Sequence, residues 1–198
     1  MLKHLSCTIC NHLITNRIIP RQQVEIYQYG FELLISSLLT LCSILLLSCC
    51  FRSLHYGLLY LVLSIPLRVS VGGYHASTYT RCYFISNLCF LSCFSASKLI
   101  TACKLSPAIW ISLLLGSFLF ITCNAPIRNR NHPISYRILK KNKRFSVCFL
   151  TLCTIIIILL YSRMTQSELL NFSVLTILSV ALLMLPSLQE RGKEHDLC

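Results

Sequence analysis

Acidic side chains are scarce in this sequence, and their placement tells more than their number. Only 6 of the 198 residues are Asp or Glu, and none of them lies between residues 33 and 167. A carboxylate metal cluster, a membrane aspartyl protease and a Ser-His-Asp triad each need an acid in that stretch, as does most proton-coupled transport. Chemistry in the middle of the chain therefore has to use Cys, His, Ser, Thr, Asn or Arg.

Charged residues of either sign are also rare. They make up 12% of the chain, against about 25% in an ordinary soluble domain. Hydrophobic residues make up 55%, and the mean hydropathy is +0.69. Such a chain has too little polar surface to stay in solution, and its abundant, clustered apolar residues exclude intrinsic disorder. The composition predicts an integral membrane protein.

Six apolar runs predict an all-α membrane protein with about six transmembrane helices. The runs cover residues 33–50, 53–67, 83–103, 105–125, 146–162 and 168–186. A straight helix needs about 20 apolar residues to cross a bilayer, so the second span is short or re-entrant. It either extends to Val71 with Arg68 snorkelling, or packs against protein as a re-entrant segment. Four spans with irregular segments are the alternative.

The chain is expected to form a single membrane domain over residues 1–198. Residues 1–30 are too polar to span a bilayer and lack a signal-peptide cleavage pattern. Apolar residues recur there at helical spacing, which predicts an amphipathic helix on the inner leaflet; they are Leu2, Leu5, Ile9 and Leu13. Residues 31–186 would then form the helical membrane core, and residues 187–198 a cytoplasmic tail.

Cysteine is abundant, with 13 residues, but the placement argues against a disulfide framework. Most of the cysteines lie within or at the ends of apolar runs, where a thiol behaves as a small hydrophobe. Near the N-terminus, two cysteines and two histidines have spacings compatible with zinc: His4, Cys7, Cys10 and His12. A Cys-x-x-Cys without a second well-spaced pair is weak evidence, so we expect no metal site and no cofactor.

Basic residues give the orientation. The chain has 18 Lys and Arg and a net charge of +12. With the N-terminus inside, all but four of these cations fall on cytoplasmic segments, as the positive-inside rule expects; the four are Arg52, Lys98, Lys104 and Arg163. Both termini are therefore predicted to be cytoplasmic.

A basic cluster lies in the predicted loop between the fourth and fifth runs. Its members are Arg137, Lys140, Lys141, Lys143 and Arg144. Their first role is topological, and they are also possible contacts for anionic lipid headgroups or for an acidic segment of a substrate. No nucleic-acid partner is expected.

The segment between the second and third runs contains a histidine followed seven residues later by a cysteine, His75 and Cys82. This pair is the minimum for a thiol nucleophile, because the imidazole takes the proton and later returns it. On a straight helix the two would share a face but lie about 10.5 Å apart along the axis, so the chain has to bend between them. The residues expected to support the pair are Arg68, Gly72, Gly73 and Arg81.

The local sequence predicts how the chain bends. His75 is expected on the Gly-Gly turn, since two adjacent glycines break a helix. Cys82 is expected in the first turn of the third spanning helix, with Thr78 or Thr80 as its N-cap. There the helix dipole and Arg81 would favour a thiolate. A chance approach of one of 13 cysteines to a histidine is the alternative.

These residues resemble the accessory gene regulator protein B family (AgrB), membrane peptidases of Gram-positive quorum sensing. The first matching block is Gly72-Gly-Tyr-His-Ala76 with Cys82, preceded by Arg68 and followed by Ser86. The second is Asn124-Ala-Pro126, then His132-Pro-Ile134 and the basic cluster. Length, number of runs and order of motifs agree over essentially the whole chain.

The resemblance implies a function. Family members cleave a ribosomally made pro-peptide near its C-terminal end, on the cytoplasmic side of the bacterial cell membrane. The family's nucleophile matches Cys82 and its general base matches His75. A thioester acyl-enzyme would be attacked by a Cys or Ser of the bound peptide, which releases a thiolactone or lactone autoinducer. The resemblance also implies a homodimer. The alternative is a non-enzymatic small permease or export subunit in which the pair is incidental.

Overall fold

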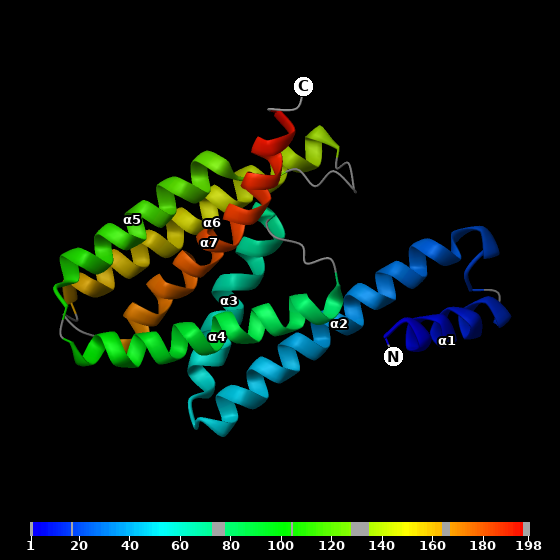
Figure 1. Cartoon of the computed structure of the whole chain (residues 1–198), viewed down its shortest axis with the longest axis horizontal. Coiled ribbons are helices and arrows are strands. Elements are labelled where there is room, and N and C mark those ends of the chain that lie inside the picture. The colour runs from blue at the N-terminus through cyan, green and yellow to red at the C-terminus, as the bar shows by residue number, and fades with distance from the viewer. Residues whose placement is uncertain are drawn as a thin grey trace.

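The computed structural model describes residues 2–16, 18–72, 78–103, 105–127, 135–163 and 167–195. In these ranges all regular structure is helical (Figure 1). The elements are α1 (Leu2–Thr15), the 3-10 turn η1 (Arg21–Gln23), α2 (Val24–Cys50), α3 (Leu54–Val71), α4 (Tyr79–Ala102), α5 (Pro107–Asn124), α6 (Tyr136–Arg163) and α7 (Glu168–His195). The prediction of an all-α protein is confirmed.

Six helices, α2 to α7, are long and apolar enough to cross a bilayer. The short second run corresponds to α3, which continues to Val71 as one helix of 18 residues with Pro66 inside it. A helix of that length measures about 27 Å, close to the thickness of a hydrocarbon core. The prediction of six spans is confirmed, and the second span takes its extended form.

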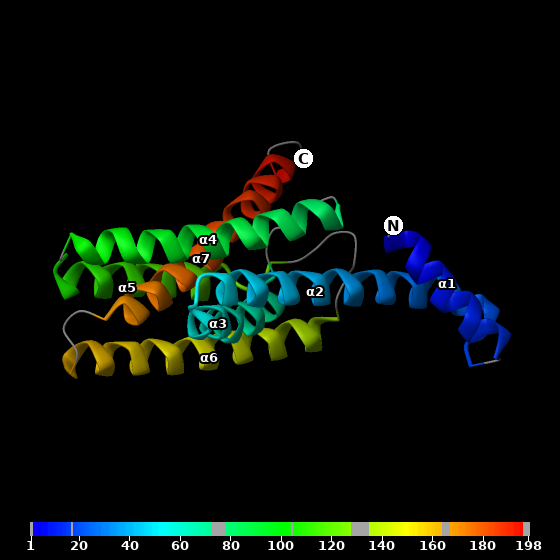
Figure 2. The same cartoon turned by 90° about the horizontal axis from the view of Figure 1, so that it is seen from below.

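Successive long helices run in alternate directions, which gives the bundle two ends (Figures 1 and 2). The Cys82 end holds the starts of α2, α4 and α6 and the ends of α3, α5 and α7. The Glu168 end holds the opposite termini of these helices. The two longest stretches of sequence between spanning helices run from Val71 to Tyr79 and from Asn124 to Tyr136, and all four of these helix termini lie at the Cys82 end. Functional residues concentrate between the elements of a rigid scaffold, so the Cys82 end is the candidate location of the functional site.

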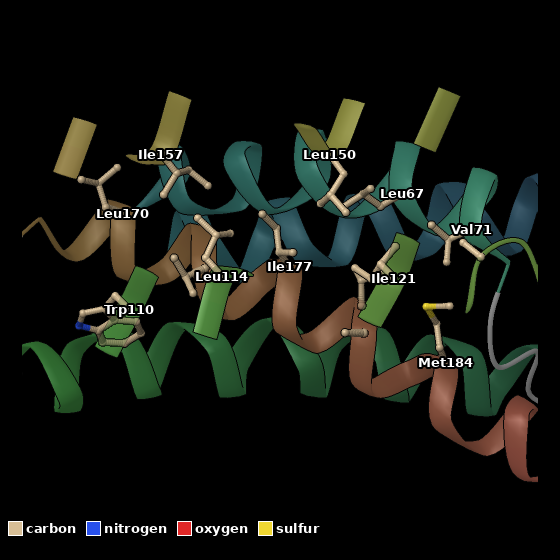
Figure 3. Close-up of a cluster of buried hydrophobic side chains, with 14 of the residues drawn as sticks. Leu67, Val71, Trp110, Leu114, Ile121, Leu150, Ile157, Leu170, Ile177 and Met184 are labelled. Carbon is tan, nitrogen blue, oxygen red and sulfur yellow. The ribbon is translucent and has the colours of Figure 1, made fainter. Parts of the chain in front are cut away.

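Helix α7 is the centre of the packing, since it contacts α3, α4 and α5. Figure 3 shows the largest apolar cluster, to which α3, α5, α6 and α7 all contribute. Its labelled members are Leu67, Val71, Trp110, Leu114, Ile121, Leu150, Ile157, Leu170, Ile177 and Met184. A second, aromatic cluster joins α3, α4 and α7 through Tyr56, Tyr60, Phe90, Phe94 and Phe172. Together the two clusters hold both ends of α3, and the second cluster also holds one face of α4.

Helix α1 lies beside the first turns of α2, away from the main bundle (Figure 2). It packs through Ser6 and Cys10, which are fully buried, whereas Leu5 of the predicted apolar stripe is 51% exposed. The exposed Leu5 is consistent with a helix that turns one face to lipid. Residue Ser6 donates a hydrogen bond to the buried Glu32 of α2 at 3.2 Å, so a polar contact anchors α1.

The basic cluster lies on a helix and not in a loop, which corrects the sequence-based interpretation. Helix α6 begins at Tyr136, ten residues before the apolar run. Residues Leu139, Ser146 and Leu150 are buried on one face of it, and Lys and Arg are good helix formers. Because Leu139 is buried, the helix begins before the basic residues, and all five cations of the cluster belong to its first turns.

Candidate active site

Cys82 lies in the first turn of α4, as predicted. The N-cap is Thr78, which has an extended backbone (φ −140°, ψ 145°) and accepts a hydrogen bond from the Arg81 backbone N–H at 3.4 Å. The Cys82 N–H donates to the Thr78 carbonyl at 3.2 Å and closes the first helical turn. The thiol is free, and its residue is exposed. An accessible cysteine at a capped helix N-terminus meets the first requirement for a thiol nucleophile.

The other half of the predicted pair, His75, and the neighbouring Gly73 lie outside the described residues. Their approach to Cys82 remains a prediction. The other supporting residues are placed: Arg68 belongs to the last turn of α3 and Arg81 to the first turn of α4. Both are helical, at the end of one spanning helix and the start of the next.

Gly72 ends α3 in a conformation that other residues rarely adopt. Its φ is +71°, and an added Cβ would lie 2.9 Å from the Ile127 carbonyl oxygen. Next to it, the Ile127 N–H donates to the Val71 carbonyl at 2.9 Å. The backbone after Asn124-Ala-Pro126 therefore lies directly on the end of α3. Gly72 of the first block and Ile127, which directly follows the Asn124-Ala-Pro126 segment, therefore meet at the Cys82 end although they are distant in sequence.

Arg68 reaches from α3 across to α4. Its Nη1 donates to the Ser86 hydroxyl oxygen at 2.9 Å, and Ser86 is only 3% exposed. The Tyr60 hydroxyl donates to the Ser86 backbone carbonyl at 3.4 Å. Because Ser86 follows Cys82 by four residues, it lies one helical turn further along the same side of α4. The guanidinium therefore faces the α4 surface that leads to Cys82.

Sequence reasoning missed Glu32. This carboxylate lies one residue outside the acid-free stretch, is 6% exposed, and accepts hydrogen bonds from Ser6 at 3.2 Å and from Gln28 at 3.4 Å. Tyr79, the first residue of α4, also interacts electrostatically with Glu32. The stretch thus has no acid in its sequence, but the first residue of the Cys82 helix lies near an acid in the fold. Only the pairing of α2 with α4 reveals this.

The described residues offer no metal centre, because they contain no group of three His, Cys, Asp or Glu side chains that could hold an ion. Cys10, one of the four zinc-compatible residues, is buried against α2. The twelve cysteines in the described ranges are free thiols. Three residues of the basic cluster line an open hollow of about 470 Å³ on the surface of α6, together with Val147 and Cys148; the three are Lys140, Lys143 and Arg144.

Fold and site together define a multi-pass α-helical membrane protein with an accessible cysteine at the capped start of a spanning helix. The family model described as accessory gene regulator B matches residues 6–186, and the chain belongs to that family. Comparison with curated proteins and with solved structures gives no match. Membership supports a role in the processing of an accessory gene regulator autoinducer.

Proposed function

We propose that this protein is a membrane cysteine endopeptidase that cleaves an autoinducer pro-peptide near its C-terminal end and promotes its cyclisation. Cys82 is the nucleophile, and His75 is the general base and acid. The observation that carries the proposal is the placement of Cys82. Its exposed thiol lies at the N-terminus of α4, at the end of the bundle where the two motif blocks meet.

The reaction follows from the chemistry of this pair. The His75 imidazole takes the thiol proton, and the Cys82 sulfur attacks the scissile carbonyl carbon. The C–S bond forms and the peptide C–N bond breaks, while the imidazolium returns its proton to the leaving amine. The imidazole then takes the proton of a thiol or hydroxyl of the bound peptide, whose sulfur or oxygen attacks the thioester carbon. The bond from that carbon to the Cys82 sulfur breaks, and the imidazolium returns the proton to the leaving thiolate. This step closes a thiolactone or lactone ring and frees Cys82, so cleavage needs no water.

The deciding experiment is co-expression of the chain with an autoinducer pro-peptide, for which a short reading frame next to its gene is the first candidate. Processing should stop in Cys82→Ala and in His75→Ala and persist in Cys103→Ala. Cys103 is a matched control because it is an exposed free thiol at the other end of the same helix. Processing by both Cys82→Ala and His75→Ala would overturn the peptidase proposal in favour of the non-enzymatic permease or export subunit.

We place the Cys82 end in the cytoplasm, with both termini on that side and α1 on the inner leaflet of the bacterial cell membrane. The cation distribution supports this orientation. Cys82 and Cys103 provide the test, because both are exposed and lie at opposite ends of α4. A membrane-impermeant maleimide should label Cys82 only in inverted vesicles and Cys103 only in right-side-out vesicles. The reverse pattern would contradict the orientation.

The basic cluster on α6 is proposed to contact an acidic segment of the pro-peptide or anionic lipid headgroups. Its five cations belong to the first turns of the helix, at the Cys82 end. Substrate binding predicts that neutralising Lys140, Lys141, Lys143 and Arg144 raises KM in a salt-dependent way. Unchanged kinetics would leave the cluster with its topological role. A homodimer is also proposed, and the mass of the purified protein in detergent tests it.

A further inference from the structure

The proposed acyl transfer needs hydrogen-bond donors for the oxyanion that forms at the scissile carbonyl. Such donors are often the largest single contribution to catalysis of acyl transfer. The residues nearest to Cys82 in sequence that could provide one are the Cys82 backbone N–H, Ser86 and Asn87. The structure shows what each of them already does.

Two of these three donors are engaged within the fold. The Cys82 N–H bonds to the Thr78 carbonyl at 3.2 Å. The Asn87 side chain donates to the Tyr83 carbonyl at 2.9 Å and accepts from Ser43 of α2 at 2.8 Å. Asn87 also follows Cys82 by five residues, which turns it about 140° away around the helix. Neither group faces an acyl group on the Cys82 sulfur.

Ser86 differs from most serines on these helices. Ser70 and Ser97, for example, donate their hydroxyl hydrogens to carbonyls three or four residues earlier. The Ser86 hydroxyl accepts from Arg68, and within the described residues no acceptor takes its own hydrogen. Position 86 is turned only about 40° from position 82, and side chains at this spacing have Cβ atoms about 5–6 Å apart. The Ser86 hydroxyl is therefore one helical turn from the Cys82 sulfur on the same side of α4.

Arg68 brings further unused donors to the same place. A guanidinium carries five N–H groups, and Ser86 accepts the one hydrogen bond that the described structure gives it. Its charge also acts on Cys89, seven residues after Cys82 on that side of α4. Among the side chains that the structure describes, which do not include those after Pro186, no carboxylate lies within ion-pair distance of Arg68. A half-buried arginine inside a membrane helix is a ready site for a developing negative charge.

We infer that Arg68 and Ser86 form the oxyanion site of the Cys82 reaction. This inference rests on the proposed function. When the Cys82 sulfur bonds to the scissile carbon, the carbonyl π electrons move onto oxygen, and that oxygen accepts hydrogen bonds from the Arg68 guanidinium and the Ser86 hydroxyl. The same donors serve the second tetrahedral intermediate, when the peptide's own nucleophile attacks the thioester. Arg68 and Ser86 are therefore catalytic in both halves of the reaction.

Two small reagents test the inference without a peptide substrate. Acylation of a thiol by p-nitrophenyl acetate passes through an oxyanion, whereas alkylation by iodoacetamide is a direct displacement with none. Rates are read at each cysteine by peptide mass spectrometry of the full-length protein in nanodiscs. The exposed Cys7 on α1 is an internal control, because α1 packs against α2 and not against the helix that contains Arg68.

We expect Arg68→Met and Ser86→Ala to lower the ratio of acylation to alkylation at Cys82 by about 10²-fold, the usual cost of losing one such donor. The ratio at Cys7 should not change. Ser97→Ala, on the same helix, and Lys98→Met, at the Glu168 end, should leave the Cys82 ratio as in the wild type. In Arg68→Lys the ratio at Cys82 should lie between those of the wild type and Arg68→Met, because lysine keeps the charge but lacks the planar guanidinium.

Other outcomes would overturn the inference. An unchanged ratio means that the pair does not contact the oxyanion, and equal falls in both rates mean that Arg68 acts only on thiol reactivity. A rise in KM for the precursor with an unchanged kcat would make Arg68 a substrate-binding residue. Failure here is distinguishable from failure of the proposed function, which is decided by whether Cys82→Ala still processes the precursor.

Discussion

The two ends of the helix bundle use the same kinds of polar contact to different effect. At the Glu168 end, the Tyr56 hydroxyl donates to Glu168 at 3.0 Å. In the same region Asn171 accepts from Tyr161 at 2.6 Å and donates to Thr101 at 2.8 Å. These groups satisfy one another and join α3, α4, α6 and α7. The polar groups named here are therefore hydrogen-bonded within the fold.

At the Cys82 end, fewer of the described polar groups have partners. Among the described residues, the Arg68 guanidinium makes one hydrogen bond, to Ser86, and the Cys82 thiol is exposed. The Ile127 N–H donates to the Val71 carbonyl at the same end. Under the proposed function, Arg68, Ser86 and Cys82 are the groups that contact the substrate. Changes at the two ends should therefore have separable consequences.

Among the substitutions that compare the packing of the two ends, the largest effect is expected from Gly72→Ala, at the Cys82 end. The substitution places a Cβ at φ +71° and 2.9 Å from the Ile127 carbonyl, at a cost of about 1–2 kcal/mol from backbone strain alone. To relieve it, the chain after α3 has to move off residue 127, which displaces the segment that leads to His75. Precursor processing should fall about tenfold or more. Gly116→Ala is the control, since nothing lies within 4 Å of its added Cβ.

The matching change at the Glu168 end is Gly57→Ala, which should affect stability and not catalysis. An added Cβ there would meet the Cβ of Ser48 on α2 at 2.7 Å, and overpacking of this kind costs about 1–3 kcal/mol. Thermal unfolding in detergent should show the loss, while processing per folded molecule stays at the wild-type rate. A tenfold loss of specific activity in Gly57→Ala would erase the distinction between the ends.

A smaller loss is expected from Asn171→Leu, which removes the link between Tyr161 and Thr101. Interhelical hydrogen bonds in membranes contribute about 0.6 kcal/mol on average and up to about 1.7 kcal/mol, so the destabilisation should lie in that range. The midpoint of unfolding measures it, with Tyr161→Phe as the variant that removes one of the two bonds. Stability equal to wild type in both would mean that this network contributes nothing.

Much of this architecture could be predicted from the sequence because it depends on patterns along the chain. The apolar runs predict six spans, and the Thr78 to Cys82 spacing predicts the N-cap and first turn of α4. Contacts between distant segments could not be predicted in this way. The Arg68–Ser86 bond and the position of Ile127 on Gly72 depend on how α3, α4 and α5 pack. The helical start of α6 was missed because a cation-rich sequence looks like a loop until Leu139 is seen to be buried.

The smallest predicted effect concerns Glu32, which anchors α1 at the Cys82 end through Ser6. Burial, and secondarily the neighbouring Cys7, raise the pKa of the Cys10 thiol. At neutral pH the docked Cys10 is therefore thiolate less often and is alkylated more slowly than exposed Cys7. Glu32→Ala should loosen α1, lower the pKa of Cys10 toward its ordinary value and raise its alkylation rate several-fold.

Peptide mass spectrometry after iodoacetamide treatment measures the alkylation rates of Cys7 and Cys10. Glu25→Ala, which changes an exposed acid on the first turn of α2, should leave Cys10 slow. Equal alkylation rates of Cys7 and Cys10 in the wild type would show that α1 does not pack against α2. The Ser6–Glu32 hydrogen bond would then not hold α1 in place.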